Sequence, residues 1–319
     1  MEALSKENRN YFMGIAIILV ILHHFCLRME DAWHVDSFPF NLFYWGQIGV
    51  DVFLFVSAYG CGASWENNKW WQYLVNRVKR IYPQYVVFLF IVLCWFYADA
   101  SVLHRLKLAA YSLIGVAPIY QLGVRIEWYM PSLIMMYLFL PVLYSVINKT
   151  RRYYGGGYLL VFVAILLPWL LKEPLIYYPF LARFPVIICG VMAYVHRGDI
   201  EYLIKFFTFA TLLILTTREN MVIHSMMIPL LLAALSMVNL EKKPLERVLS
   251  FCGCHSLEIF FAQTITTQFM MQRYFWIDKW LSLLIIVGLT IVFSFLFGGV
   301  QRLFDVTYKS FIVKQSNLK

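Results

Sequence analysis

Ten apolar runs, most of them as long as a helix that crosses a lipid bilayer, dominate this sequence of 319 residues. A spanning helix needs about 20 predominantly apolar residues. Hydrophobic residues make up 61% of the chain, against roughly 45–50% in a soluble domain. We therefore predict an all-α, polytopic integral membrane protein with about ten transmembrane helices. The predicted spans are residues 11–27, 42–62, 84–99, 128–147, 158–172, 181–196, 203–217, 221–238, 250–271 and 280–301.

The distribution of basic residues predicts which way these helices run. With the N-terminus in the cytoplasm, most of the 27 Lys and Arg residues fall in inner segments, as the positive-inside rule requires. An even number of spans then leaves both termini cytoplasmic. The first run lacks a small-residue cleavage site, so we expect it to be retained as a span. No internal repeat divides the chain, so residues 1–319 are expected to form a single membrane domain.

Charge and cysteine usage argue against two classes of ligand. The net charge of +9 is carried by loops between apolar runs and not by a soluble basic domain, so we expect no nucleic-acid binding. The six cysteines lie in or beside apolar runs and form no pair of C-x-x-C motifs. We interpret them as small buried hydrophobic residues and expect no metal site.

Ionisable residues inside apolar runs are the first candidates for chemistry, because a charge at bilayer depth costs roughly 2.5–3.5 kcal/mol. His23 and His24 lie towards the outer end of the first run, and Asp51 lies in the second. A carboxylate that accepts one ring N–H leaves the other nitrogen of the histidine as a base. A histidine that only hydrogen-bonds a neighbouring helix is the structural alternative.

Basic and acidic residues near the ends of other runs could bind ligands. Arg77 and Arg80 lie three positions apart at the inner end of the third run. They would share a helical face that suits phosphate oxygens, although topology alone favours basic residues there. Glu127 and Trp128 begin the fourth run and Arg183 begins the sixth. Glu127 could line an outward-facing polar pocket or be a solvated loop residue. Trp128 fits an interfacial aromatic belt or a surface that stacks on a sugar, and Arg183 could hold an anionic group or anchor its helix at the interface.

The ninth run is the most polar, because it contains Glu258 and Gln263. A glutamate at this depth needs a partner and is expected to border a wet cavity. Hydrogen bonding between helices is the alternative.

Five groups of segments form one ordered pattern along the chain. They are Met13-Gly14-Ile15-Ala16 through His24, Gly49-Val50-Asp51-Val52-Phe53 with Ser57-Ala58-Tyr59, Arg77-Val78-Lys79-Arg80-Ile81-Tyr82-Pro83, Arg183-Phe184-Pro185 with Gly190, and Ser256-Leu257-Glu258-Ile259-Phe260. Together they resemble the membrane-bound acyltransferase-3 family, bacterial enzymes that O-acylate sugars of surface polysaccharides. The likeness covers residues 11 to about 304.

The resemblance implies roles for individual residues. It selects His24, eleven positions after Met13, as the catalytic histidine, and Asp51 would orient it. It implies that the basic segment binds the nucleotide part of acyl-CoA through Arg77, Lys79 and Arg80. The residues assigned to the acceptor substrate are Glu127, Trp128, Arg183, Glu258 and Gln263.

The chain departs from the family pattern at three positions. Met13 stands where the family has a basic residue, Ala58 where it has glycine, and Gln263 where histidine is frequent. Met13 removes a cationic partner from the predicted site. Arg9, about one helical turn earlier, is a candidate substitute.

The predicted function is O-acyl transfer, with acetyl as the family's usual group, from cytoplasmic acyl-CoA to a sugar hydroxyl of a surface or exported polysaccharide. The enzyme would be a multi-pass protein of the bacterial inner membrane with no bound cofactor. Expected partners are acyl-CoA, a polysaccharide or lipid-linked sugar, the lipid bilayer and polysaccharide-assembly proteins. Two alternatives stay open: a transporter or flippase of a lipid-linked sugar, and a degenerate family member that binds acyl-CoA without transferring its acyl group.

Overall fold

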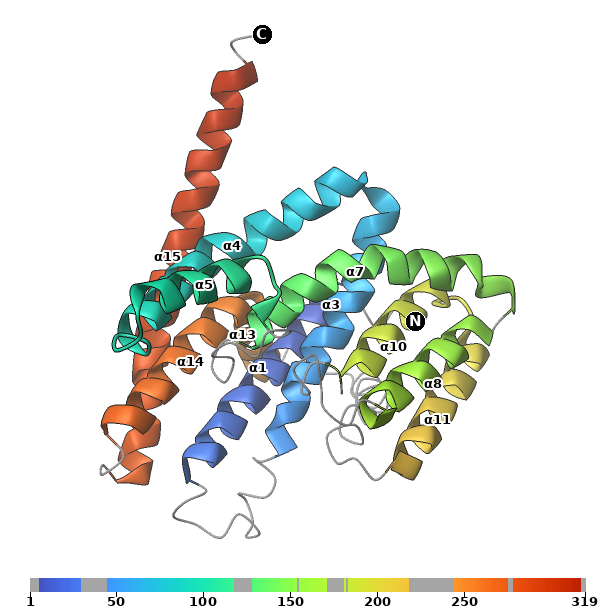
Figure 1. The fold of residues 1–319 in the computed structure, drawn as a ribbon, viewed down its shortest axis with the longest axis horizontal. Coiled ribbons are helices and arrows are strands. Elements are labelled where there is room, and N and C mark those ends of the chain that lie inside the picture. The colour runs from blue at the N-terminus through green and yellow to red at the C-terminus, as the bar shows by residue number, and fades with distance from the viewer. Residues whose placement is uncertain are drawn as a thin grey trace. The chain divides into compact units, whose positions relative to one another are not determined.

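A computed structural model of the chain describes residues 6–29, 45–117, 128–153, 155–170, 181, 183–217, 244–274 and 278–316. Every regular element within these ranges is a helix (Figure 1), so the prediction of an all-α fold is confirmed for them. The elements are α1 (Lys6–Met29), η2 (Trp45–Gln47), α3 (Ile48–Asn67), α4 (Trp70–Trp95), α5 (Val102–Leu113), α7 (Tyr129–Lys149), η3 (Arg151–Tyr153), α8 (Gly155–Leu170), α10 (Phe184–Val195), α11 (Ile200–Thr217), α13 (Pro244–Cys254), α14 (Ser256–Arg273) and α15 (Lys279–Ser316).

Five of the described helices are long and apolar enough to cross a membrane, which confirms a membrane protein in general terms. They correspond to the windows Arg9–Cys26, Trp45–Asn67, Trp70–Trp95, Tyr129–Lys149 and Trp280–Ser310. A sixth is added if α13 and α14 are taken as one broken span. α8 and α10 contain shorter apolar stretches. The predicted span 221–238 lies outside the described residues.

Two predicted boundaries are corrected. The span 250–271 was expected to be one helix, but the chain breaks at His255 between α13 and α14. The third span was expected to begin near residue 84, whereas α4 begins at Trp70 and includes Pro83. The basic segment therefore lies inside a helix and not at its entrance. α5 lies outside the ten predicted spans and is followed by Gly115 at φ +80°.

The helices form two compact units. The first unit comprises Met1–Tyr73 and Ala110–Cys254, and the second comprises Leu74–Ala109 and His255–Lys319. The single membrane domain expected for residues 1–319 stays a prediction.

Close helix contacts hold the first unit together. α1 packs against α3 and α13, and α3 packs along α10. A Cβ built on Gly190 of α10 would lie 2.5 Å from the carbonyl oxygen of Phe55 in α3. A Cβ on Gly253 of α13 would overlap the Asn10 carbonyl of α1. Glycine at these positions lets the backbones approach, as small residues do between membrane helices.

Aromatic rings form the core of the second unit, in which α14 packs along α15. The Phe261 ring of α14 lies 4.8 Å from that of Phe88 and 6.2 Å from that of Tyr85, both in α4. On its α15 side, the ring centroid of Phe261 is 5.5 Å from that of Phe297. Ring contacts at these separations add to the stabilisation from burial.

Candidate active site

A buried ion pair joins the first turns of α3 and α10 in the first unit. Pro185 lies in the first turn of α10 and suits its start, and Arg183 is the N-cap residue. The Arg183 Nε lies 2.9 Å from Oδ1 of Asp51, and the two side chains are only 4% and 1% exposed. Asp51 lies in the first turn of α3, where the helix dipole favours a carboxylate. The two charges therefore compensate each other away from solvent.

An aromatic ring completes this group. The Arg183 guanidinium carbon lies 5.4 Å from the ring centroid of Trp128, within the range of a cation–π contact. Sequence analysis named Asp51, Trp128 and Arg183 separately, and the structure brings the three together. Glu127, the fourth residue predicted at this side, lies outside the described residues.

The two histidines lie on α1, next to η2 and α3. His23 and His24 are half-buried, with ring centroids 5.8 Å apart. A Cβ on Gly46 of η2 would lie 3.2 Å from the Cβ of His23, so the backbone of η2 approaches α1 at this depth. His23 therefore lies where η2 packs against α1, and the predicted catalytic histidine, His24, is its half-buried neighbour on that helix.

The helical geometry of α3 directs Asp51 towards α10. Gly49 contacts the Ala16 carbonyl of α1. Residues two apart on a helix point about 200° apart, so Asp51 points away from the contact that Gly49 makes. Its carboxylate pairs with Arg183, and its pairing with His24 stays a prediction.

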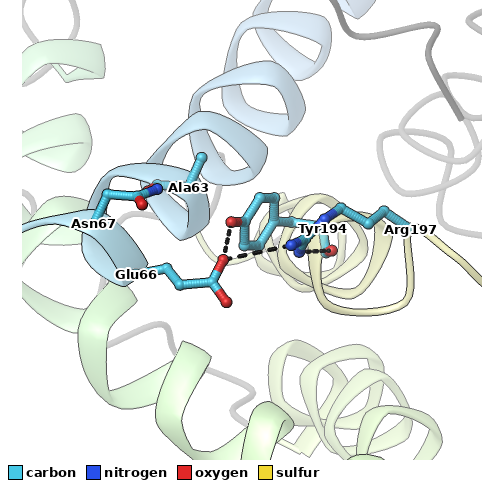
Figure 2. Close-up of polar contacts among 5 residues, drawn as sticks. All are labelled: Ala63, Glu66, Asn67, Tyr194 and Arg197. Carbon is cyan, nitrogen blue, oxygen red and sulfur yellow. Dashed lines mark hydrogen bonds and ion pairs between the residues drawn. The ribbon is translucent and has the colours of Figure 1, made fainter.

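A second charged group links the other ends of α3 and α10 (Figure 2). The Tyr194 hydroxyl donates a hydrogen bond to Glu66 Oε2, and Arg197 Nη2 lies 3.6 Å from the same oxygen. Arg197 Nη1 also donates to the Tyr194 carbonyl at 3.1 Å. The charged side chains here are about half exposed, at 49% for Arg197 and 44% for Glu66. This group was not predicted from the sequence, although a carboxylate four positions after a predicted span was a usable signal.

The ion pairs at Asp51 and Glu66 show that α3 and α10 run parallel. The start of one helix contacts the start of the other, and their ends also meet. Gly190 contacts Phe55 between these two points. α3 and α10 correspond to the second and sixth predicted spans.

The basic segment of α4 belongs to the second unit. Arg80 is exposed, whereas Arg77 and Lys79 are half-buried. The three-residue spacing of Arg77 and Arg80 lies within continuous helix, as expected. Lys79 Nζ lies 3.9 Å from the ring centroid of Tyr308 in α15. The ammonium group predicted to bind the nucleotide therefore contacts an aromatic face of the protein.

Glu258 of α14 has the polar partner that its depth requires. Gln84 Nε2 donates to Glu258 Oε1 at 3.1 Å, and His255 Nδ1 lies 4.0 Å from the same oxygen. Sequence analysis missed the buried Gln84, whose position in an apolar helix directly after Pro83 was the available signal. Gln263, also buried, donates to the Thr264 hydroxyl at 2.9 Å within its own helix.

The predicted site residues divide between the two units. His24, Asp51, Trp128 and Arg183 belong to the first unit, and Arg77, Lys79, Arg80, Glu258 and Gln263 belong to the second. Among the described residues, no group of three or more His, Cys, Asp or Glu side chains is arranged to hold a metal ion. The predicted site residues of the first unit therefore offer a histidine that can act as a base, and the Asp51–Arg183 ion pair.

A family model described as an acyltransferase domain matches residues 10–299. The chain belongs to the acyltransferase-3 family. The resemblance inferred from the sequence segments is thereby confirmed, and the protein is an acyltransferase by family. No curated protein and no solved structure matches the chain. The last part of α15, from residue 300 onwards, lies beyond the range that the acyltransferase-3 model covers.

Proposed function

We propose that this acyltransferase-3 protein transfers an acyl group from cytoplasmic acyl-CoA to a sugar hydroxyl of a surface or exported polysaccharide. The family match over residues 10–299 carries the proposal of membrane acyl transfer. The donor and acceptor follow from the resemblance of the individual segments. Acetyl-CoA is the proposed donor, because acetyl is the family's usual group.

The proposed base is His24. Its neutral imidazole takes the proton of the sugar hydroxyl as the oxygen attacks the thioester carbonyl. The C–S bond then breaks, and the CoA sulfur leaves as a thiol after receiving a proton. One ester bond replaces one thioester bond, so no oxidant or further co-substrate is needed.

The acceptor side is proposed to include Arg183 and Trp128. A tryptophan face beside a guanidinium suits a sugar ring, because the ring offers apolar C–H groups and hydroxyl oxygens. Asp51 is proposed to act on the acceptor side as well, because its Oδ1 lies 2.9 Å from the Arg183 Nε. Orientation of His24 by Asp51 is a separate part of the proposal. The other proposed acceptor residues are Glu127, Glu258 and Gln263.

The donor side is proposed to be the basic segment of α4. Arg77 and Arg80 would bind the CoA phosphates through charge-assisted hydrogen bonds, with Lys79 adding positive charge nearby. The proposed topology is a single domain of ten spans with both termini in the cytoplasm. In this topology the basic segment would face the cytoplasm, where acyl-CoA is made. The proposed location is the bacterial inner membrane, with polysaccharide-assembly proteins as partners.

The test is transfer of labelled acetyl from acetyl-CoA into surface polysaccharide by membranes that contain the protein. Wild type should transfer label and His24→Ala should not, whereas His23→Ala, one position away, should keep most of the activity. Equal transfer by wild type and His24→Ala would refute the catalytic role of His24.

The same assay separates the alternatives. Bound acetyl-CoA with no label transferred by wild type would favour the degenerate reading, for which Met13 is the specific observation. Movement of a lipid-linked sugar across the membrane without modification would favour a transporter.

A further inference from the structure

Pro83 leaves one carbonyl of α4 without its helical hydrogen bond. Proline has no N–H, so the carbonyl of the residue four positions earlier loses its donor, and the ring also pushes that carbonyl aside. Here that residue is Lys79, in the middle of the basic segment. A backbone carbonyl inside a membrane protein needs a replacement donor.

Gln301 of α15 supplies the replacement donor. Its Nε2 donates to the Lys79 carbonyl at 3.1 Å, and the same nitrogen lies 3.1 Å from Asp305 Oδ1. Its Oε1 accepts from Gln84 Nε2 at 3.4 Å, a weak hydrogen bond. Gln84 in turn donates to Glu258 at 3.1 Å. A chain of side-chain amides therefore connects the basic segment of α4 to both α15 and α14.

The side chain of Lys79 contacts α15 as well. Its ammonium lies 3.9 Å from the ring centroid of Tyr308, and the Tyr308 ring stacks on Phe304 with centroids 6.0 Å apart. Tyr308 lies seven positions after Gln301, and residues seven apart share a helix face. One face of α15 thus holds both the backbone and the side chain of Lys79.

α15 is longer than a membrane span requires, and it continues past these contacts to Ser316. α15 has 38 residues, whereas about 20 suffice to cross the hydrocarbon core. Gln301 is the last residue of the predicted span 280–301, and residues 301–308 lie beyond the part of the chain that the family model matches.

We infer that residues 301–308 of α15 position the basic segment of α4, with Gln301 and Tyr308 as positioning residues that set how Arg77 and Arg80 meet an anionic ligand. The inference rests on the proposed function, in which that ligand is the phosphate-bearing part of acyl-CoA. Gln301 fixes the peptide between the two arginines, and Tyr308 keeps the Lys79 ammonium on α15. Arg77 and Arg80 then lie on a helix whose turn between Lys79 and Pro83 is held in one geometry.

The experiment uses the full-length protein in lipid nanodiscs and two readouts. The first is the dissociation constant for acetyl-CoA, and the second is hydrogen exchange of the α4 amides. Gln301→Leu removes the donor to the Lys79 carbonyl. We expect the dissociation constant to rise about two- to tenfold, the equivalent of one lost hydrogen bond, with faster exchange around residues 77–84.

A second substitution makes the test specific. Pro83→Ala restores the N–H that the Lys79 carbonyl lacks, so Gln301→Leu should have little further effect in the Pro83→Ala background. A purely structural role elsewhere in α15 would not depend on Pro83. Tyr308→Leu should also weaken binding, whereas Tyr308→Phe, which keeps the aromatic face, should bind as wild type does.

The matched control is Thr290→Val. It removes a buried contact between α15 and α14, in which the Thr290 and Thr266 hydroxyl oxygens lie 2.9 Å apart. Wild-type affinity in Thr290→Val together with weaker binding in Gln301→Leu would support the inference.

Three results would overturn the inference. The first is wild-type affinity for acetyl-CoA in the Gln301→Leu variant. The second is an equal loss of affinity on Gln301→Leu substitution in the wild-type and the Pro83→Ala backgrounds. If Arg80→Ala still weakens acetyl-CoA binding in either of these cases, the proposed donor site stands and only the positioning role of α15 is refuted. A wild-type protein that binds no acetyl-CoA would refute the proposed donor and the inference with it.

Discussion

Replacing Arg183 by methionine should destabilise the protein by about 3–5 kcal/mol, because the carboxylate of Asp51 would stay buried without its counter-charge. The two charges lie 2.9 Å apart, and both side chains are almost fully buried. Asp51→Leu should cost a similar amount for the same reason. The double substitution, which removes both charges, should be close to wild type.

The magnitude follows from two opposing terms. At 2.9 Å and an effective dielectric constant of about 20, the attraction is about 6 kcal/mol. Taking two ions out of water costs several kcal/mol each, so the pair adds little net stability. Breaking it leaves the desolvation cost of one ion uncompensated. Two single losses of about 3–5 kcal/mol each that are absent from the double variant correspond to a coupling free energy of about 6 kcal/mol or more between positions 51 and 183.

The assay is reversible unfolding in mixed micelles as the mole fraction of SDS is raised, for wild type, both single variants and the double variant. The pair at the other ends of the same two helices is a matched control. Glu66 and Arg197 lie 3.6 Å apart and are about half exposed. Their coupling in the same cycle, measured with Glu66→Gln and Arg197→Met, should be about 0–1 kcal/mol.

Additive effects of Asp51→Leu and Arg183→Met would contradict this reasoning. So would equal coupling for the buried and the exposed pair, because burial would then not decide the cost of breaking an ion pair between these helices.

Two further predictions concern packing and buried polar contacts. Gly190→Ala should cost about 1–3 kcal/mol through overpacking, because its Cβ would lie 2.5 Å from the Phe55 carbonyl oxygen; Gly288→Ala, which meets open space, should be neutral or stabilising in the same unfolding assay. Gln84→Leu should cost about 1.5–3 kcal/mol, since it removes a donor to the Glu258 carboxylate. Its cost should shrink in a Glu258→Leu background, and an unchanged cost would show that this hydrogen bond is not what Gln84 contributes.

Parts of the candidate site could be predicted one residue at a time. Asp51 and Arg183 stand out because charges are rare within apolar runs. Their pairing could not be predicted, because it depends on which helices are neighbours. The sequence suggested a histidine as the partner of Asp51, since α1 and α3 are adjacent along the chain. The pairing of Asp51 with His24 stays a prediction beside the ion pair that Asp51 makes with Arg183.

The break at His255 had no clear signal in the apolar pattern. Residues 250–271 have the length and composition of a single span. The contact of Gly253 with the Asn10 carbonyl commits α13 to the first unit, whereas α14 packs with α15 in the second. Packing partners therefore interrupt a helix that local composition would continue.

The sequence by itself determined that this is a helical membrane protein with its ionisable groups at a few positions, because the length and polarity of each run depend only on local composition and bilayer thickness. Its segment order also identified the acyltransferase-3 family. Only the tertiary structure decided which polar groups meet. Gln84 bonds Glu258 across 174 positions, and Gln301 bonds the Lys79 carbonyl across 222. Contacts at such separations depend on helix packing, which local composition does not specify.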